Sequence, residues 1–291
     1  MNKWLRCIAK ALGITAVAFV IGSWIVAGQF IAPAPSKVTW PTQLPFTPKD
    51  VIFQATDGIN LKGWFLPQAN STDAVVLLHG VSANRLQMLQ RALWLHDLGY
   101  NVLLYDARGC GESTPVHPSF GYAETRDLLG ALSWLQSNGM TQVGCIGFSQ
   151  GAATVLLASG QLPPSLRAVV AEASYSTLRD SVDDHFRLNT GLSSGYFGVL
   201  AIPIAEWKLG LKMDDVSPLR EIPKLKVPVY LIGGTSDVIA PASGIQHLYA
   251  AAVCEKTLWL IEWAGHGDFF SYVEDEYKQR VGDFLRRHLR P

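Results

Sequence analysis

Apolar and polar positions follow two different periods along the chain after residue 49. Short runs that are apolar throughout alternate with longer segments in which apolar residues recur at helical spacing. The expected strands are 51–56, 59–66, 75–78, 101–105, 142–148, 168–171, 229–232 and 257–261, and the expected helices are 84–98, 122–136, 150–159, 243–251 and 274–289. Apolar strands that alternate with helices predict an α/β fold with a mostly parallel sheet and helices on both faces. Asp57-Gly58 is a hairpin-turn signal, which adds an antiparallel pair at one edge.

One stretch interrupts the alternation between the strands 168–171 and 229–232. More than fifty residues lie there, and 195–211 is apolar and contains glycines. A connection of this length inside a compact domain typically forms a lid or a binding segment. We therefore expect a lid insertion at about 176–224, which is also compatible with an ordinary extra pair of helices.

The N-terminal segment 11–32 carries no charged residue, and Lys3, Arg6 and Lys10 precede it. A helix of that length spans about 30 Å, the thickness of a bilayer core. We expect residues 1–10 to be a basic flank and 11–32 to be a transmembrane signal anchor. The positive-inside rule places the N-terminus in the cytoplasm and the following domain outside it, in the periplasm if the source is bacterial.

Two other interpretations of this segment compete with that of a transmembrane anchor. A helix buried in the domain is disfavoured, because the segment is apolar on all faces. A cleaved signal peptide has an apolar core of about 7–15 residues and a small-x-small cleavage site. Here the run is longer, and the best pair of small residues, Ala32 and Ala34, is interrupted by Pro33 and followed by Pro35. Residues 33–48 hold five prolines and predict an extended linker, and 49–291 form the α/β domain.

Charge and cysteine content exclude several classes of partner. The 291 residues carry 24 Lys and Arg against 24 Asp and Glu, so the formal net charge is zero. This balance gives no electrostatic reason to expect a nucleic acid as partner. The four cysteines show no CxxC or Cys/His spacing, which argues against a zinc site or a disulfide framework.

The candidate chemistry begins at residues 147–151, which read GFSQG and fit the pattern G-x-S-x-G. The pattern alone is weak, because 191–195 (GLSSG) also fits it. A nucleophile elbow needs a strand before the turn and a helix after it, and only the first copy has both. We expect Ser149 to be a nucleophile and Ser193 to be a loop serine.

A serine hydroxyl needs a base to take its proton. The chain order of this constellation is serine, acid, histidine, which leaves four histidines after Ser149. His266 lies in a glycine-flanked loop directly after the last expected strand, where α/β enzymes place reactive groups. His185 falls in the lid, His247 in a helix and His288 in the basic C-terminal run. We expect His266 to be the base.

The remaining roles are an acid that orients the imidazole and two donors for an oxyanion. Asp237 follows the strand 229–232 and is the expected acid, with Glu262 as its rival. Asp268 is too close to His266 and is expected to cap the next helix or loop. The expected donors are the backbone N–H groups of Gln150 and of Val81, in the loop after the strand 75–78. Histidine 79 in that loop is expected to be structural.

These motifs resemble the α/β-hydrolase superfamily from about residue 49 to the end. Within it, the chain is similar to the small serine hydrolase group of serine aminopeptidase-like, prolyl oligopeptidase-like and monoacylglycerol lipase-like enzymes. Besides GFSQG, the matching pieces are DG (57–58), LKGW (61–64), HG (79–80), DARGCGES (106–113), DDVSP (214–218), VPV (227–229) and GH (265–266). The resemblance implies hydrolysis of esters, thioesters or amides without a cofactor. It also implies structural roles for Arg108 and Ser113.

The expected function is therefore that of a serine hydrolase which cleaves a small-molecule ester, as a carboxylesterase or a lipase-like enzyme. A serine peptidase or an acyltransferase would use the same triad, and a silent membrane-tethered binding protein would have no need for all of these residues. Residues 196–204 are almost entirely apolar, which predicts a lid over a small or medium acyl group. Packing on a membrane surface or in the core is the rival interpretation of this stretch.

Overall fold

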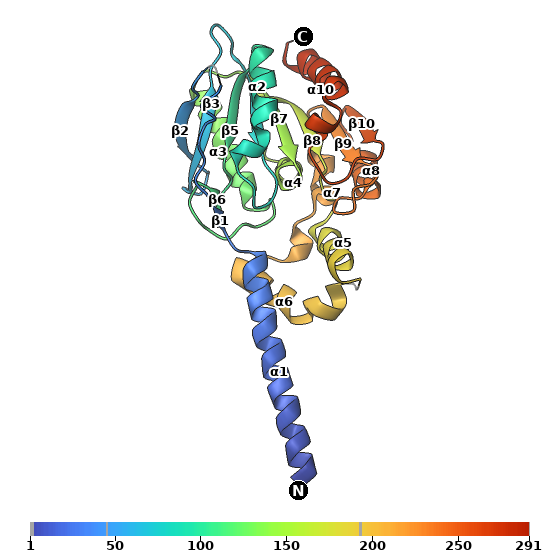
Figure 1. Ribbon diagram of the computed structural model, residues 1–291. Helices are drawn as coiled ribbons and strands as arrows, with labels where there is room; N and C mark the ends of the chain where they lie inside the picture. The colour runs from blue at the N-terminus through green and yellow to red at the C-terminus, as the bar shows by residue number, and fades with distance from the viewer. Residues whose placement is uncertain (1–2, 45, 192–193, 291) are drawn as a thin grey trace.

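The computed structural model describes residues 3–44, 46–191 and 194–290, and its central feature is a twisted sheet (Figure 1). In these residues eight strands pair in the order β10-β9-β8-β7-β4-β5-β3-β2. The strands are β2 (Lys49–Gln54), β3 (Asn60–Leu66), β4 (Asp73–Leu78), β5 (Asn101–Tyr105), β7 (Gln142–Phe148), β8 (Leu166–Glu172), β9 (Val229–Gly234) and β10 (Lys256–Ile261). Six run parallel, and β3 pairs antiparallel with β5 and β2. The predicted fold class is confirmed.

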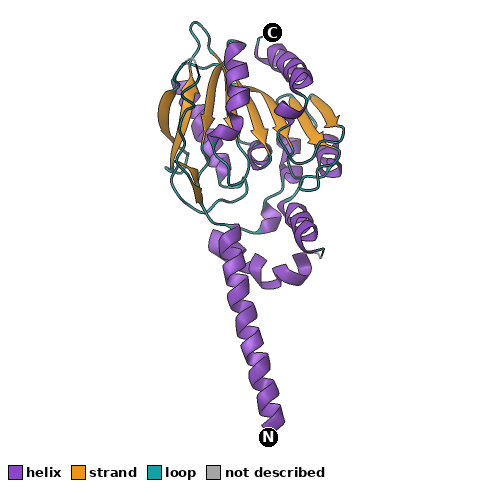
Figure 2. Cartoon of the chain, viewed as in Figure 1, coloured by secondary structure: helices purple, strands orange, loops and turns teal. Residues whose placement is uncertain are grey.

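Helices cover both faces of the sheet (Figure 2). Two apolar cores result, because successive side chains of a strand point to opposite faces. In β4, Val75 and Leu77 enter one core, whereas Val76 and Leu78 enter the other. The first core includes α2 (Leu89–Asp97) and α10 (Glu274–Leu289), and the second includes α3 (Glu124–Ser137), α4 (Gln150–Leu157) and α8 (Ala242–Ala251).

The insertion expected at about 176–224 packs on the N-terminal helix in its middle part, whereas its last two short helices pack on helices of the domain. It consists of α5 (Leu178–Thr190), α6 (Ser194–Leu209), η2 (Met213–Asp215), α7 (Pro218–Glu221) and η3 (Ile222–Lys224). A third apolar cluster joins Ala27 and Ile31 to Ala201 and Ala205 of α6. Figure 1 shows α6 beside the end of the N-terminal helix, α1 (Lys3–Phe30). The described part of the expected lid stretch is therefore packed against α1, while the side chains of 196–197 lie outside the described residues.

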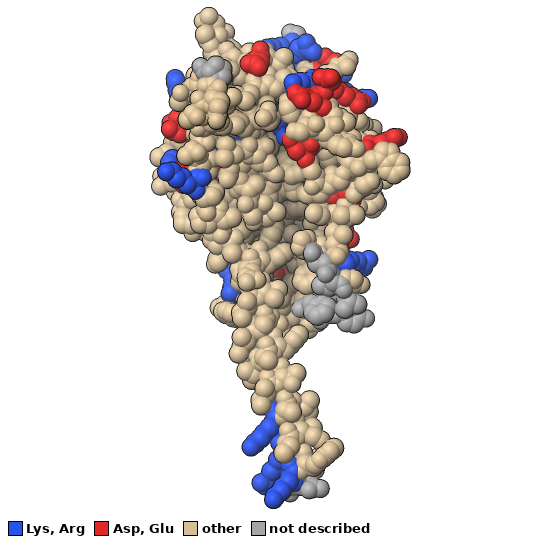
Figure 3. Space-filling model, viewed as in Figure 1, with Lys and Arg blue, Asp and Glu red and all other residues tan. Residues whose placement is uncertain are grey.

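Helix α1 projects away from the domain for most of its length. It is long and apolar enough to cross a membrane, and only Ser23 and Ala27 within it are buried. Basic residues gather at its free tip, beyond a surface that is free of charge (Figure 3). These features fit a membrane anchor or a signal sequence.

The linker after α1 is extended but not free. Its strand β1 (Ala34–Pro35) pairs parallel with β6 (Cys110–Gly111). The N–H of Ala34 donates to the carbonyl of Gly109 at 2.7 Å, and the N–H of Ser36 donates to that of Gly111 at 2.8 Å. Pro35 fits between them, because a ladder of this register needs no donor at its position. The linker is thus attached to the domain within a few residues of the helix.

Candidate active site

Ser149 occupies a strained turn between β7 and α4. Its φ of 53° and ψ of −116° are unfavourable for a residue with a side chain. Both glycines of the pentapeptide are needed for this turn. A Cβ on Gly147 would lie 2.5 Å from the backbone of Gly151, and a Cβ on Gly151 would lie 2.4 Å from the carbonyl oxygen of Leu78. The turn is also held by the N–H of Ser149, which donates to the carbonyl of Glu172 at 2.8 Å.

The three residues expected to form a triad lie in hydrogen-bond contact. His266 Nε2 is 3.0 Å from Ser149 Oγ, and His266 Nδ1 is 2.8 Å from Asp237 Oδ2. The other oxygen of Asp237 accepts the N–H groups of Ile239 and Ala240 at 2.9 and 2.8 Å. These bonds orient the buried carboxylate toward the ring. With Nδ1–H donating to the carboxylate, Nε2 carries the lone pair that can accept the serine proton.

The rival residues lie elsewhere. Glu262 is exposed, and the contact to His266 comes from Asp237 instead. His185 lies on α5, His247 on α8 and His288 on the last turn of α10. Ser193 lies outside the described residues. The glycine that opens its pentapeptide, at position 191, is the left-handed cap that ends α5, so no strand precedes this second G-x-S-x-G.

The expected oxyanion donors belong to the residue after Ser149 and to the loop after β4. Gln150 is the first residue of α4, and the N–H of such a residue has no acceptor within its own helix. Val81 follows the end of β4, in a loop fixed by His79. The ring of His79 donates from Nδ1 to the carbonyl of Gly80 at 2.7 Å and accepts the N–H of Ala107 at Nε2, 3.0 Å away. Burial lowers the pKa of His79, which keeps the ring neutral, and these bonds fit the expected structural role.

A buried arginine that sequence reasoning missed connects both halves of this site. Arg91 Nη2 lies 2.6 Å from Glu172 Oε2, and Nη1 lies 2.6 Å from Asp268 Oδ1. Tyr277 contributes its hydroxyl to the same cluster. Glu172 is the residue whose carbonyl holds the N–H of Ser149, and Asp268 follows His266 by two positions. The arginine therefore connects the backbone under the serine to the histidine loop.

Asp268 makes further contacts besides those of the helix cap that the sequence predicts. It occupies the N-cap position of α9 (Phe269–Tyr272) and accepts the hydroxyl of Ser271 at 2.5 Å. Burial by itself would raise the pKa of Asp268, but the charge of Arg91 together with the hydrogen bonds from Ser271, Arg91 and the backbone N–H of Phe270 outweighs it, and the pKa is lowered. The residue is thus ionised and paired at neutral pH.

A cleft of about 370 Å³ lies between α5 and the loop after Asp237. Its lining is largely polar and includes three aspartates of α5, at positions 180, 183 and 184, together with Ala240. Burial, with the nearby charge of Asp180, raises the pKa of Asp184. The lid therefore presents polar groups toward the acid loop, whereas its apolar helix α6 faces α1.

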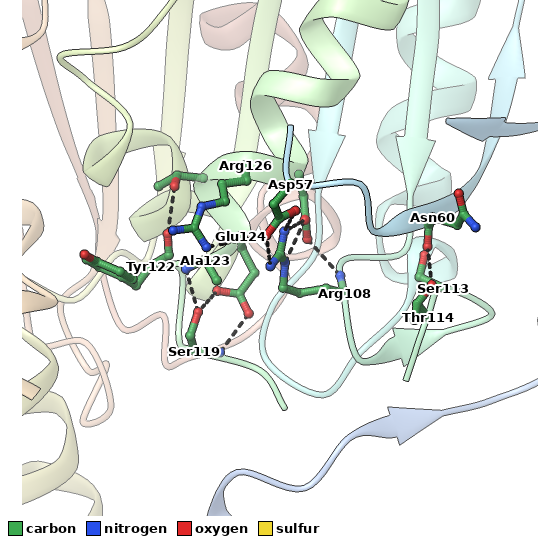
Figure 4. A network of polar contacts seen from close by, with 12 residues as sticks. Asp57, Asn60, Arg108, Ser113, Thr114, Ser119, Tyr122, Ala123, Glu124 and Arg126 are labelled. Carbon is green, nitrogen blue, oxygen red and sulfur yellow. Dashed lines mark hydrogen bonds and ion pairs between the residues drawn. The ribbon is translucent and has the colours of Figure 1, made fainter. Parts of the chain in front are cut away.

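The arginine of the DARGCGES segment has a different setting (Figure 4). Arg108 binds both oxygens of Asp57 at 2.8 and 2.9 Å and pairs with Asp127 of α3. Ser113 donates to the carbonyl of Asp106 at 2.6 Å and accepts the N–H of Lys62 at 2.9 Å. These bonds join loops of the scaffold, as the structural roles implied for Arg108 and Ser113 require.

Comparison with known proteins agrees with the observed fold. The family model described as alpha/beta hydrolase fold matches residues 73–215. The chain is similar to YqkD of Bacillus subtilis, at 29% identity over 78% of this chain and 76% of that one. It is also similar to Rv2307c of Mycobacterium tuberculosis, at 27% identity over 90% of both. Among solved structures, an esterase of Pyrococcus furiosus, Pf2001, matches at a TM-score of 0.74 and 26% identity, over 88% of this chain and 99% of that one.

Proposed function

Because the chain belongs to the α/β-hydrolase superfamily and is a hydrolase, we propose that it cleaves esters through an acyl-enzyme on Ser149. The observation that carries the proposal is the pair of hydrogen bonds from His266, at 3.0 Å to the serine and 2.8 Å to Asp237. The Pyrococcus furiosus esterase supports an ester rather than a peptide as substrate. A serine peptidase or an acyltransferase would use the same three residues.

The proposed mechanism assigns one step to each of these groups. Ser149 Oγ attacks the ester carbonyl while His266 Nε2 takes the serine proton, and Asp237 stabilises the imidazolium that forms. The N–H groups of Val81 and Gln150 bind the oxyanion of the tetrahedral intermediate. The imidazolium then gives its proton to the leaving alkoxide. A water molecule, deprotonated by the same ring, releases the acid from the serine.

The test is a substrate panel on the full-length enzyme and on two serine variants. Ser149→Ala should abolish hydrolysis of nitrophenyl esters and labelling by a fluorophosphonate, with the circular dichroism spectrum unchanged. Ser193→Ala, in the second G-x-S-x-G, should behave as the parent enzyme. Continued labelling of Ser149→Ala would show that another residue is the nucleophile. A preference for peptides over all esters, or transfer to an added alcohol, would assign the alternative activities.

We also propose that α1 is retained as a single-pass anchor, with its basic end in the cytoplasm. Ala27 and Ile31 fill the apolar cluster of the lid, and Phe30 packs on Phe120 with ring centroids 4.8 Å apart. Cleavage of a signal near residues 29–36 would separate these side chains from the domain. The full-length protein should fractionate with membranes and keep its N-terminus. A C-terminal reporter that is active only outside the cytoplasm should be active, and cytoplasmic reporter activity would reverse the orientation.

A further inference from the structure

The lid helix α6 lies beside α1 at the depth where α1 would leave a bilayer. About 20 residues cross the hydrocarbon core, and the uncharged part of α1 that follows Lys10 ends at Phe30 after that distance. The last turns of α1 are therefore at the outer interface. The ring of Trp24 lies there, 6.0 Å from that of Trp207 on α6, and Lys208 Nζ lies 4.3 Å from the centre of the Trp24 ring. Tryptophan and lysine are typical of this layer.

The outer side of α6 presents apolar side chains to the surroundings. Ala201 and Ala205 are buried in the cluster shared with α1, whereas Val199 is 59% exposed and Trp207 is 72% exposed. A helix that is apolar on both sides and packed on a membrane-spanning helix is suited to the lipid interface rather than to water. Continuity with α1 identifies the bilayer as the partner of this surface.

The catalytic edge of the sheet faces the same way. Figure 2 shows the arrowheads of the central strands pointing toward the end of the molecule where α1 and α6 meet. The linker fixes the distance, because Ser36 Oγ accepts a hydrogen bond from Asn84 Nδ2 at 3.1 Å, at the end of the loop that carries Val81. Ser36 follows Phe30 by six positions, which is at most about 20 Å of extended chain. The candidate active site is thus held close to the membrane surface.

The rim of the site is itself apolar and exposed. Val81 of the expected oxyanion loop, Val238 directly after Asp237, and Trp263 before His266 all have exposed side chains, Trp263 to 80%. Each lies on a loop at the carboxyl edge of the sheet, beside a proposed catalytic group. Exposed large apolar side chains on the loops that carry one site indicate a surface for apolar ligands or for a membrane.

We infer that α6 and this rim rest on the outer leaflet of a bilayer, and that the substrate is an amphiphilic ester which stays in that leaflet by its acyl chain. The inference rests on the proposed ester hydrolysis and adds the source of the substrate. It replaces the expectation of a small or medium acyl group with a chain long enough to hold the ester in the membrane.

The first test measures contact with lipid and needs no activity. A photo-crosslinking amino acid is placed at Val199, at Val17 of α1 or at Val253, which is 75% exposed on the loop between α8 and β10. Each full-length protein is reconstituted in phosphatidylcholine vesicles and irradiated. Positions 199 and 17 should form lipid adducts, and 253 should not. Adducts at 17 without adducts at 199 would overturn the inference.

The second test asks whether the substrate reaches the site from the bilayer. It compares the hydrolysis rates of two esters that have the same leaving group. Methylumbelliferyl palmitate is carried in the vesicles, and methylumbelliferyl acetate is dissolved in the buffer. Val199→Asp places a carboxylate against the apolar layer, so the rate with palmitate should fall about tenfold while the rate with acetate stays constant. Val253→Asp should change neither rate. Equal palmitate rates in both variants would overturn the inference, whereas acetate hydrolysis that survives in Ser149→Ala would overturn the proposed function instead.

Discussion

Two buried arginines make nearly the same ionic contacts in two different regions of the molecule. Arg91 pairs with Glu172 and Asp268, and Arg108 pairs with Asp57 and Asp127. The first cluster joins β8 to the loop of the proposed catalytic histidine, whereas the second joins the edge hairpin to α3. Whether an ion pair supports the scaffold or the site therefore depends on the elements that it connects, and not on its chemistry.

The two clusters differ in function only if the histidine loop carries the reaction. The largest predicted effect tests this condition. Asp237→Asn should lower kcat by about 10⁴-fold, because the imidazole loses control of its tautomer. Glu262→Gln serves as the control and should have a far milder effect. Steady-state kinetics on an activated ester measure both, and the reverse ranking would transfer the acid role to Glu262.

Arg91→Met should lower kcat by about 100-fold, because the histidine loop loses its connection to the backbone under Ser149 and a shift of about 1 Å is enough for such a loss. Arg108→Met is the matched control. Both changes leave buried carboxylates unpaired and should lower the free energy of unfolding by about 3–5 kcal/mol. Active-site titration with a fluorophosphonate gives kcat per folded molecule. Equal kcat values for the two variants would remove the distinction between the clusters.

Asp268→Asn should have a smaller effect on turnover, about tenfold in kcat, because the amide keeps the shape of the side chain but loses the charge that pairs with Arg91. Asp57→Asn makes the same change on the scaffold side. Its kcat should equal that of the parent enzyme. The two clusters would be functionally equivalent if both variants lost activity alike.

The smallest effect concerns His79, which supports the other side of the site without a charge. Burial lowers the pKa of His79 below its ordinary value of 6.5, so below pH 6.5 the unfolded chain binds a proton that the folded chain does not. The free energy of unfolding should therefore fall as the pH drops from 6.5, by at most about 1.4 kcal/mol per pH unit for this group. Denaturant titrations of the parent and of His79→Gln measure it. The slope should be shallower in the variant, and identical slopes would contradict the assignment.

The central strands of the sheet could be predicted because each contains a short apolar run. The strands 101–105 and 142–148 were expected with the bounds that β5 and β7 have in the structure. Strands β1 and β6 could not be predicted, because two residues show no periodicity and their pairing joins segments far apart in sequence. The packing of α6 on α1 was not evident either, since both helices are largely apolar and neither pattern identifies its partner.

Some residues of the site could likewise be predicted from the sequence, and others could not. Local patterns and chain order were enough to single out Ser149, Asp237 and His266, whose side chains the structure brings into contact. Arg91 has no motif around it. Its helical spacing from Met88 and Leu95, both buried, was the one available signal, because it places a charge on the apolar face of α2. Its carboxylate partners come from distant segments that no local pattern connects.

The packing of α1 on the lid also sets an order for folding during synthesis. Helix α1 leaves the ribosome first, but Trp207, which packs against Trp24, is made only after most of the domain. At about 5–20 residues per second this delay lasts roughly ten to forty seconds. Strands β2 to β8 can form in that interval, since β9 and β10 follow α6 in the chain, whereas the apolar cluster around Ala27 and Ile31 has to wait for α6. In the proposed anchor, the bilayer is the apolar phase that shelters the end of α1 until α6 has been made.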